Sequence, residues 1–261
     1  MVNTELTLKI AQQLKKSGIE SARFEAKQIV EFAKTEDEAL KLTEKRISGE
    51  PLQYLLGFWE FYGLPFYVGK GVLIPRADTE TLVDVALEII GDKQMKVIDL
   101  CSGSGAVAIA VAKKTKARVT ALEKSNEAFA FLEKNVKLNE AEVECISGDV
   151  FDDHAEEYDL VLSNPPYIPT KVIEGLSKEV KKEPIMALDG GEDGLKFYKH
   201  LTASWKGRIT DGGHLAVEIG YDQGESVSKL FEDNGFTEVK IYKDLSGNDR
   251  VIIGTIKGQA T

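Results

Sequence analysis

The chain has few of the residues that build covalent or metal-held frameworks. Its 261 residues include only two cysteines and three histidines. Cys101 and Cys145 form no paired spacing, so we expect neither a disulfide framework nor a zinc site. His154, His200 and His214 stand in no nucleophile or metal-ligand pattern, and we interpret them as surface or packing residues. No metal is therefore expected.

Long apolar runs and excess positive charge are also missing. No run approaches the roughly 18 residues that a membrane-spanning helix needs, and residues 1–10 lack a signal-peptide pattern. The net charge is −10 and the pI is about 5.0, which argues against direct nucleic-acid binding. We expect a cytoplasmic, monomeric protein with no membrane contact.

The tetrapeptide Asn164-Pro165-Pro166-Tyr167 suits the methylation of a planar, amide-like NH2 group. Such a nitrogen is a poor nucleophile, so a site must offer acceptors whose hydrogen bonds strengthen as the nitrogen becomes cationic. The Asn164 side-chain oxygen and the Pro165 carbonyl are such acceptors, and the prolines lock φ. Tyr167 can lie flat on the planar group. The alternative interpretation is a rigid turn that ends a strand.

A small-residue turn indicates a cofactor loop. Residues 96–100 predict a buried strand, and an apolar helix is expected from residue 105. Gly103 and Gly105 permit positive φ and a close backbone approach by a ligand, at a helix N-terminus that attracts carboxylate or phosphate. The spacing also satisfies the dinucleotide fingerprint, so the turn alone leaves a nicotinamide or flavin cofactor open.

Two acidic residues narrow this choice. Glu123 ends the next predicted strand, at the usual position of a carboxylate that binds both ribose hydroxyls. Asp99 lies inside the first strand. Together with the NH2 clamp after the fourth strand, these residues favour S-adenosyl-L-methionine, because a nicotinamide enzyme has no use for such a clamp.

Alternating patterns predict an α/β fold. We place strands at 96–100, 118–122, 142–146, 158–163, 213–219, 237–242 and 250–256, and helices near 105–114, 125–138, 192–208 and 222–234. This alternation implies a mostly parallel, doubly wound sheet covered on both faces, with the last two strands antiparallel. If the first and fourth strands are neighbours where the strand order reverses, the methyl donor and the NH2 clamp face each other.

We divide the chain into a helical domain (1–50), a linker with a β-hairpin about Gly63 (51–76) and a catalytic domain (77–261). Apolar residues at helical spacing mark the first domain: Leu6, Ile10, Leu14, Phe24, Ile29, Val30, Ala33, Leu40 and Ile47. A capping box at 35–38 starts its third helix. The domain presents a macromolecular substrate, or it is a structural cap.

Several separated motifs together resemble the protein-(glutamine-N5) methyltransferases of class 1 peptide chain release factors, the HemK/PrmC family. The motifs are the linker 51–57, the marker 73–80, the cofactor loop 99–105, the clamp 164–167 and the late turn 248–250. The resemblance implies a seven-stranded methyltransferase sheet with an N-terminal helical domain, S-adenosyl-L-methionine as cofactor, and methylation of the glutamine in the Gly-Gly-Gln loop of a release factor.

The resemblance also implies site residues. Those for the cofactor are Asp99, Cys101, Ser102, Gly103, Ser104, Gly105, Glu123, Asp149, Val150 and Asn164; those for catalysis and substrate are Asn164, Pro165, Pro166 and Tyr167, with Arg76 added for substrate. This chain departs from the family pattern at three positions. Cys101 replaces a glycine, Ala77 a proline and Glu123 an aspartate.

Three alternatives stay open at this point. A nucleic-acid amino-methyltransferase, acting on adenine N6 or guanine N2, would use the same clamp, although it needs a basic surface to neutralise phosphates. A sister enzyme would methylate a glutamine of a ribosomal protein. A cofactor-binding scaffold without catalysis is disfavoured by the intact clamp.

Overall fold

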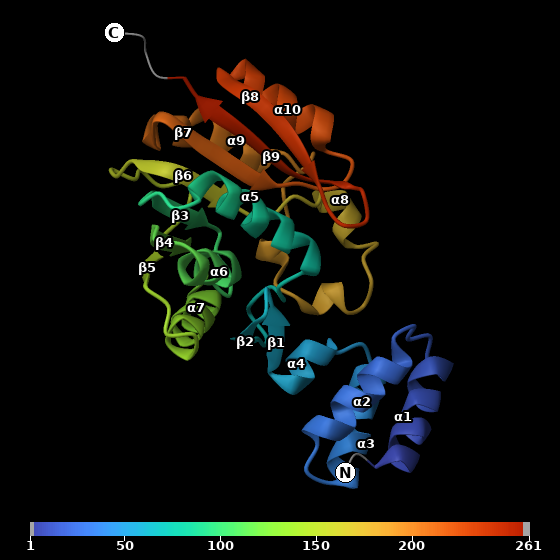
Figure 1. Ribbon diagram of the computed structural model, residues 1–261. Coiled ribbons are helices and arrows are strands. Elements are labelled where there is room, and N and C mark those ends of the chain that lie inside the picture. The colour runs from blue at the N-terminus through green and yellow to red at the C-terminus, as the bar shows by residue number, and fades with distance from the viewer. Residues whose placement is uncertain (1–2, 258–261) are drawn as a thin grey trace.

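The computed structural model describes residues 3–257, which form a helical lobe and a larger α/β body (Figure 1). The helices are α1 (Thr4–Lys16), α2 (Ala22–Phe32), α3 (Glu36–Ile47), α4 (Leu52–Leu56), α5 (Glu80–Ile90), α6 (Ala106–Lys114), α7 (Asn126–Leu138), α8 (Thr170–Ile173), α9 (Lys196–Ala203) and α10 (Gly224–Asp233). Short 3-10 turns are η1 (Ala77–Thr79), η2 (Val180–Lys182), η3 (Ile185–Ala187) and η4 (Trp205–Arg208). The strands are β1 (Phe58–Phe61), β2 (Leu64–Tyr67), β3 (Lys96–Leu100), β4 (Arg118–Glu123), β5 (Val143–Ser147), β6 (Tyr158–Ser163), β7 (Ile209–Glu218), β8 (Phe236–Lys243) and β9 (Asp249–Ile256).

The body is built on the predicted seven-stranded sheet, whose order is β5-β4-β3-β6-β7-β9-β8. The strands from β5 to β7 are parallel, and β9 is antiparallel to both β7 and β8. The chain runs outward from β3 to β5 and then returns to place β6 on the other side of β3. The first and fourth strands are therefore neighbours at the reversal of strand order, which is the condition for the methyl donor and the NH2 clamp to face each other.

Apolar side chains alternate between the two faces of the sheet, since successive residues of a strand point to opposite sides. On β6, Leu160 and Leu162 join the core cluster under α5, α6 and α7, whereas Val161 joins the cluster under α9 and α10. Both faces are thus covered, which explains why these strands read as continuous apolar runs.

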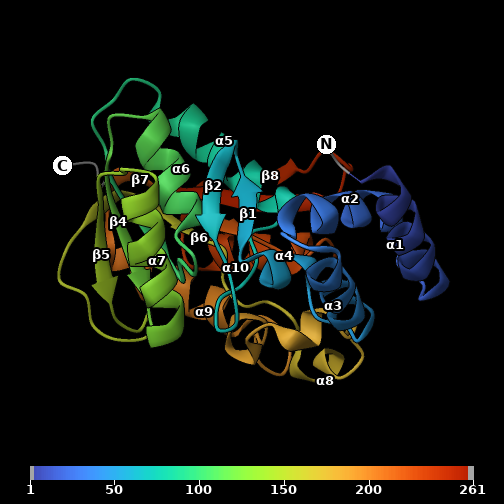
Figure 2. The same ribbon diagram turned by 90° about the horizontal axis from the view of Figure 1, so that it is seen from below.

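The helical lobe, formed by α1, α2 and α3, has its own core, and the β1–β2 hairpin lies between it and the body (Figure 2). Ile10, Leu14 and Ile29 are fully buried there. Phe24 and Ile47, which the sequence placed on apolar faces, are instead 52% and 42% exposed, because the small residues of α2 and α3 face the lobe core. None of the helices within residues 3–257 combines the length and apolarity needed to cross a membrane.

The helix expected at 192–208 is shorter than predicted. Gly191 and Gly194 have φ of 88° and 73°, a left-handed backbone that a helix cannot contain, so α9 begins only at Lys196. The chain then continues as the turn η4. The helix α4 inside the linker and the short elements α8, η2 and η3 have no counterpart in the sequence prediction.

Candidate active site

A cavity of about 620 Å³ opens at the carboxyl ends of β3, β4 and β6, a volume typical of small-molecule sites. The sequence-predicted residues that line it are Arg76, Asp99, Cys101, Ser102, Gly103, Ser104, Glu123, Asp149, Val150, Asn164 and Pro166. Three other predicted residues lie outside its wall. Gly105 caps α6, Pro165 is buried, and Tyr167 packs against the core under α9 and α10.

The loop between β3 and α6 has a left-handed backbone at three positions. The φ angles are 59° at Cys101, 55° at Gly103 and 81° at Gly105. A side chain at Gly105 would place its Cβ 2.5 Å from Leu132 Cδ1, so this position requires glycine. Cys101 is the exception among the three, because a non-glycine residue rarely adopts this conformation. The turn brings backbone N–H groups to the cavity at the start of α6.

Glu123 ends β4 with a carboxylate that is almost completely buried. Its Oε2 accepts from the Gly103 N–H at 2.8 Å and its Oε1 from the Ser125 N–H at 2.7 Å. Burial raises the pKa of Glu123, and these backbone hydrogen bonds oppose the rise. Each oxygen keeps a further lone pair, so the carboxylate can accept from two neighbouring hydroxyls of a ligand.

Asp99 connects β3 to the start of α6. It is 2% exposed, and its Oδ2 accepts from the Ala108 N–H at 3.2 Å. Burial raises the pKa of Asp99 to about 7, although the Ala108 and Ser102 hydrogen bonds favour the ionised form. This carboxyl thus fixes the strand to the helix behind the glycine turn.

Asn164 follows β6 and presents one side of its amide to the cavity. Its Nδ2 donates to Thr79 Oγ1 at 3.1 Å. Among residues 3–257, no hydrogen bond ends on Asn164 Oδ1 or on the Pro165 carbonyl oxygen. The two acceptors that the sequence assigned to an NH2 clamp are therefore free. Sequence reasoning missed Thr79, although it lies in the marker motif 73–80.

The backbone of the clamp is held from behind by another segment. A Cβ at Gly190 would lie 2.7 Å from Tyr167 Cα, and one at Gly194 would lie 2.5 Å from the Tyr167 carbonyl oxygen. Gln223 Nε2 also donates to that oxygen at 3.1 Å. Only glycine permits such close packing, so the Gly190 and Gly194 positions are a signal that the sequence analysis overlooked.

Two of the histidines support the cavity wall. His200 Nε2 and Trp205 Nε1 both contact the Val150 carbonyl oxygen, at 2.8 and 2.9 Å, and His154 Nε2 lies 2.9 Å from the Asp149 carbonyl oxygen. The next residue, Phe151, lines the cavity and was not predicted. These contacts fix the loop after β5.

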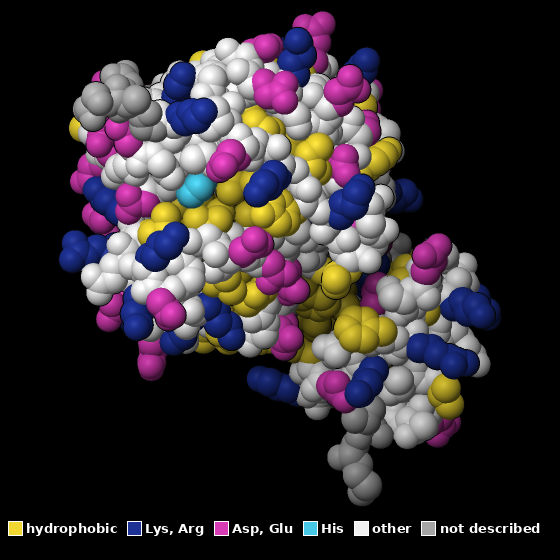
Figure 3. All heavy atoms as spheres, turned by 45° about the horizontal axis from the view of Figure 1, so that its top comes forward, with side chains coloured by type: hydrophobic (Ala, Val, Ile, Leu, Met, Phe, Trp, Pro, Cys, Tyr) yellow, Lys and Arg dark blue, Asp and Glu magenta, His cyan; other side chains and the backbone are white. Residues whose placement is uncertain are grey.

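Arg76 enters the cavity wall from the other side. It is paired with Glu183, which is buried and also accepts from the Ile74 N–H at 3.0 Å. The turn η3 follows Glu183 and lines the cavity with Ile185 and Met186, which are 61% and 50% exposed. Figure 3 shows hydrophobic side chains gathered in the recess between the helical lobe and the body. The cavity mouth thus offers apolar surface as well as an arginine.

Comparison with known proteins supports a methyltransferase fold. The family model described as "Methyltransferase small domain" matches residues 78–183. A methyltransferase structure from Pyrococcus furiosus has a TM-score of 0.59 at 18% identity, over 76% of this chain and 91% of that chain, and so shares the fold.

Two relatives carry the name release factor glutamine methyltransferase. The protein of Fusobacterium nucleatum is 46% identical over 210 residues, which are 78% of this chain and 59% of the relative. The protein of Geobacter sulfurreducens is 42% identical over 82% of this chain and 76% of the relative. With this identity and coverage, the chain belongs to the release factor glutamine methyltransferase family.

Proposed function

We propose that the protein transfers a methyl group from S-adenosyl-L-methionine to the side-chain amide nitrogen of the glutamine in the Gly-Gly-Gln loop of class 1 peptide chain release factors. The observation that carries this proposal is the orientation of Asn164. Its NH2 group is bound to Thr79, and its oxygen is left to accept from a planar NH2 group in the cavity.

The cavity fits the cofactor. Glu123 supplies a buried carboxylate for two ribose hydroxyls, and the backbone from Cys101 to Gly103 supplies N–H groups and a close approach. Phe151 adds an aromatic face for a flat base. When bound, the cofactor supplies an electrophilic methyl group. Asp149 and Val150 complete the wall on that side.

The residues of the clamp promote transfer by orienting the substrate. Asn164 Oδ1 accepts one N–H bond of the glutamine amide at the cavity wall, and the carbonyl of Pro165, which lies directly behind that wall, is the proposed acceptor of the other. Both hydrogen bonds strengthen as the nitrogen becomes cationic. Tyr167 packs against the core under α9 and α10, outside the cavity wall, and so supports the clamp from behind. The methylated amide loses its extra proton readily, so no general base is needed before transfer. Fixing the reacting atoms in line lowers the barrier by roughly 7–11 kcal/mol.

The position of the cavity favours a protruding loop as substrate. It lies at the end of the sheet, and its mouth carries Arg76 and the exposed turn η3. Glycines beside the target glutamine allow a loop to turn inside a narrow mouth without a colliding side chain. The net charge of −10 disfavours a nucleic-acid substrate. The enzyme acts as a cytoplasmic monomer on a release factor.

The test is a competition among substrates. Enzyme and labelled cofactor are mixed with a release factor, ribosomal proteins and duplex DNA, and the label is located by mass spectrometry. Label on the Gly-Gly-Gln glutamine supports the proposal. Label on a ribosomal protein or on an adenine assigns the function to one of the alternatives, and a release factor in which that glutamine is replaced by alanine is the matched control.

The helical lobe is the proposed source of substrate contacts away from the reacting centre. A shortened chain beginning near Glu50 is expected to bind cofactor but to methylate release factor inefficiently, because remote contacts fix the orientation of the target. Equal rates for the shortened and full chains would assign the lobe a structural role only.

A further inference from the structure

Glu218 is a buried carboxylate beside the clamp that the mechanism above does not use. It is the last residue of β7 and is 1% exposed. Ser163 of β6 pairs with Val217 of β7. The next residues along the chain, Asn164 and Glu218, therefore lie side by side at the carboxyl ends of the two strands. Among the described residues, Glu218 Oε2 has no hydrogen-bond partner.

The groups that face this carboxylate come from several elements. The hydroxyls of Thr79 (η1) and of Tyr167 (after β6) lie near enough to the carboxylate to lower the pKa of Glu218, although neither makes a hydrogen bond to Oε2 among the described residues. Arg250 (β9) lowers it through its charge and Asp78 (η1) raises it. Burial is the largest effect and raises the pKa to about 7. From α9, the Tyr198 hydroxyl donates to the Glu218 backbone oxygen at 2.9 Å.

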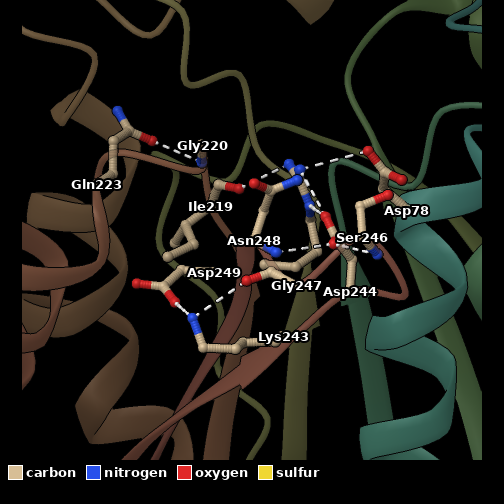
Figure 4. A network of polar contacts seen from close by, with 11 residues as sticks. Asp78, Ile219, Gly220, Gln223, Lys243, Asp244, Ser246, Gly247, Asn248 and Asp249 are labelled. Atoms are coloured by element: carbon tan, nitrogen blue, oxygen red, sulfur yellow. Dashed lines mark hydrogen bonds and ion pairs between the residues drawn. The ribbon is translucent and has the colours of Figure 1, made fainter.

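Arg250 is committed to other partners, and Figure 4 shows three of them, Asp244, Ile219 and Asp78. Its Nε and Nη2 donate to Asp244 Oδ2 at 3.2 and 3.0 Å, and its Nη1 donates to the Ile219 carbonyl oxygen at 3.1 Å. Nη2 also lies 3.3 Å from Asp78 Oδ2. Arg250 therefore anchors η1, which carries Thr79, and leaves the Glu218 carboxylate without an ion pair to any residue that the structure describes.

The Thr79 hydroxyl can donate only one hydrogen bond, because it has a single proton. Its oxygen already accepts from Asn164 Nδ2 at 3.1 Å. We propose that Glu218 is a positioning residue, whose carboxylate attracts the Thr79 hydroxyl proton and so forces the Thr79 oxygen to act only as an acceptor for Asn164. This keeps the Asn164 NH2 group on Thr79 and its Oδ1 in the cavity. The inference rests on the clamp role of Asn164 in the proposed function.

The protonation state of Glu218 then selects the amide orientation. An ionised carboxylate can only accept, which gives the orientation seen in the structure. A protonated carboxyl can donate to Thr79, whose own proton is then free for Asn164 Oδ1. The amide would turn over and withdraw its acceptor from the cavity. Turnover is therefore expected to fall as the pH decreases through about 7, the pKa of Glu218.

Kinetics of the full chain test this role. Glu218→Met removes the acceptor and is expected to lower kcat about 10- to 100-fold, less than the loss of a direct transition-state contact, because Glu218 acts through Thr79 and Asn164. Thr79→Val should give a similar loss and Thr79→Ser should restore the rate. Glu218→Gln should retain part of kcat and lose the decline in rate below about pH 7. Glu225→Gln, on the exposed face of α10, is the matched control.

A second measurement does not depend on activity. In protein labelled with ¹⁵N-asparagine, the side-chain NH2 signal of Asn164, assigned with Asn164→Ala, should shift between about pH 6 and 8 in the wild type but not in Glu218→Gln. A shift in the wild type without release-factor methylation would support the inference and reject the proposed function. An Asn164 signal that titrates equally in both proteins, or an unchanged kcat in both Thr79→Val and Glu218→Met, would overturn the inference.

Discussion

Arg46 of the helical lobe and Glu179 of the body form an ion pair, with 2.7 Å between Arg46 Nη2 and Glu179 Oε1. The same guanidinium pairs inside the lobe with Glu25, at 2.5 Å from Nε to Oε2. Four residues after Glu179, Glu183 is paired with Arg76 at the cavity. The segment from Glu179 to Glu183 therefore connects the helical lobe to the wall of the active site.

The two ion pairs of Arg46, with Glu25 and with Glu179, should contribute differently to the free energy of unfolding. Arg46→Met leaves the buried carboxylate of Glu25 with the Ser21 hydroxyl but without an ion-pair partner, and we expect it to reduce the free energy of unfolding by about 3–5 kcal/mol. The Glu179 side chain is 45% exposed, so Glu179→Ala should cost less than about 1 kcal/mol. Chemical denaturation followed by circular dichroism measures both. If both variants lost the same free energy of unfolding, the stabilisation would come from the ion pair between lobe and body and not from the pair within the lobe.

Asn164→Ala should reduce turnover at least about 100-fold, since removal of one transition-state contact costs roughly 2.7–4 kcal/mol. The melting temperature and the cofactor affinity should change much less. Asn126→Ala, at the exposed start of α7, is the control for loss of an asparagine. Near-native kcat in Asn164→Ala would contradict the clamp mechanism.

Glu123→Ala should weaken S-adenosyl-L-methionine and its demethylated product together, because both present the same ribose. Each lost charge-assisted hydrogen bond contributes on the order of 1.5–3 kcal/mol before water compensates. The loss of the Gly103 and Ser125 N–H contacts should add to the effect by loosening the loop. Calorimetry measures the affinity for both ligands, and the exposed-site variant Glu133→Ala is the reference. Unchanged affinity for both ligands would exclude Glu123 as the ribose carboxylate.

Cys101→Gly should keep activity and change the free energy of unfolding by no more than about 1 kcal/mol. The backbone at Cys101 has φ of 59°, so glycine relieves a strain of about 1–2 kcal/mol but gains freedom in the unfolded chain. Cys101→Val, which is β-branched, should be clearly destabilising at the same φ. A collapse of activity in the glycine variant, with its fold intact, would reveal a role for the thiol.

Stability should depend on pH through Asp99. Burial disfavours the charge and raises the pKa of Asp99 from its ordinary value of 3.8 to about 7 in the folded protein. The folded state binds more protons between these values, so the favourable contribution present below about pH 4 is lost as the pH rises through about 7. Compared with Asp99→Asn, the wild type should become progressively less stable over that range. Asp92→Asn, which is exposed, should show no such trend.

The sheet was predictable because its central strands are short apolar runs buried on both faces, a pattern visible from Lys96 onward. The segment between Ile168 and Gly191 was not, since its backbone makes turns and a single bridge, from Ile168 to Asp189, rather than a periodic element. The hydrophobic pattern also predicted wrongly that Phe24 lies on the buried face of its helix. In a small lobe the close packing of helices selects alanine for the core, and a large ring is left outside.

The sequence predicted those cavity-lining residues that belong to local motifs. The residues that hold Asn164 lie far from it in sequence: Thr79 precedes it by 85 residues, and its proposed positioning partner Glu218 follows much later. A strand of ordinary apolar composition ends at Glu218, and nothing in its neighbours distinguishes this carboxylate from a surface one. Its burial follows only from the strand order, which places β7 next to β6.

The position of β9 between β7 and β8 determines when the enzyme can become active during its own synthesis. A nascent chain stopped before Asp249 has β7 with one open edge and β8 without a neighbour. Arg250 is also missing from such a chain, so η1 and Thr79 lack their anchor. Domains fold as units, and contacts distant in sequence form late. The catalytic centre is therefore expected to assemble only after β9 has left the exit tunnel, so that partly translated copies carry a glycine loop but no working clamp.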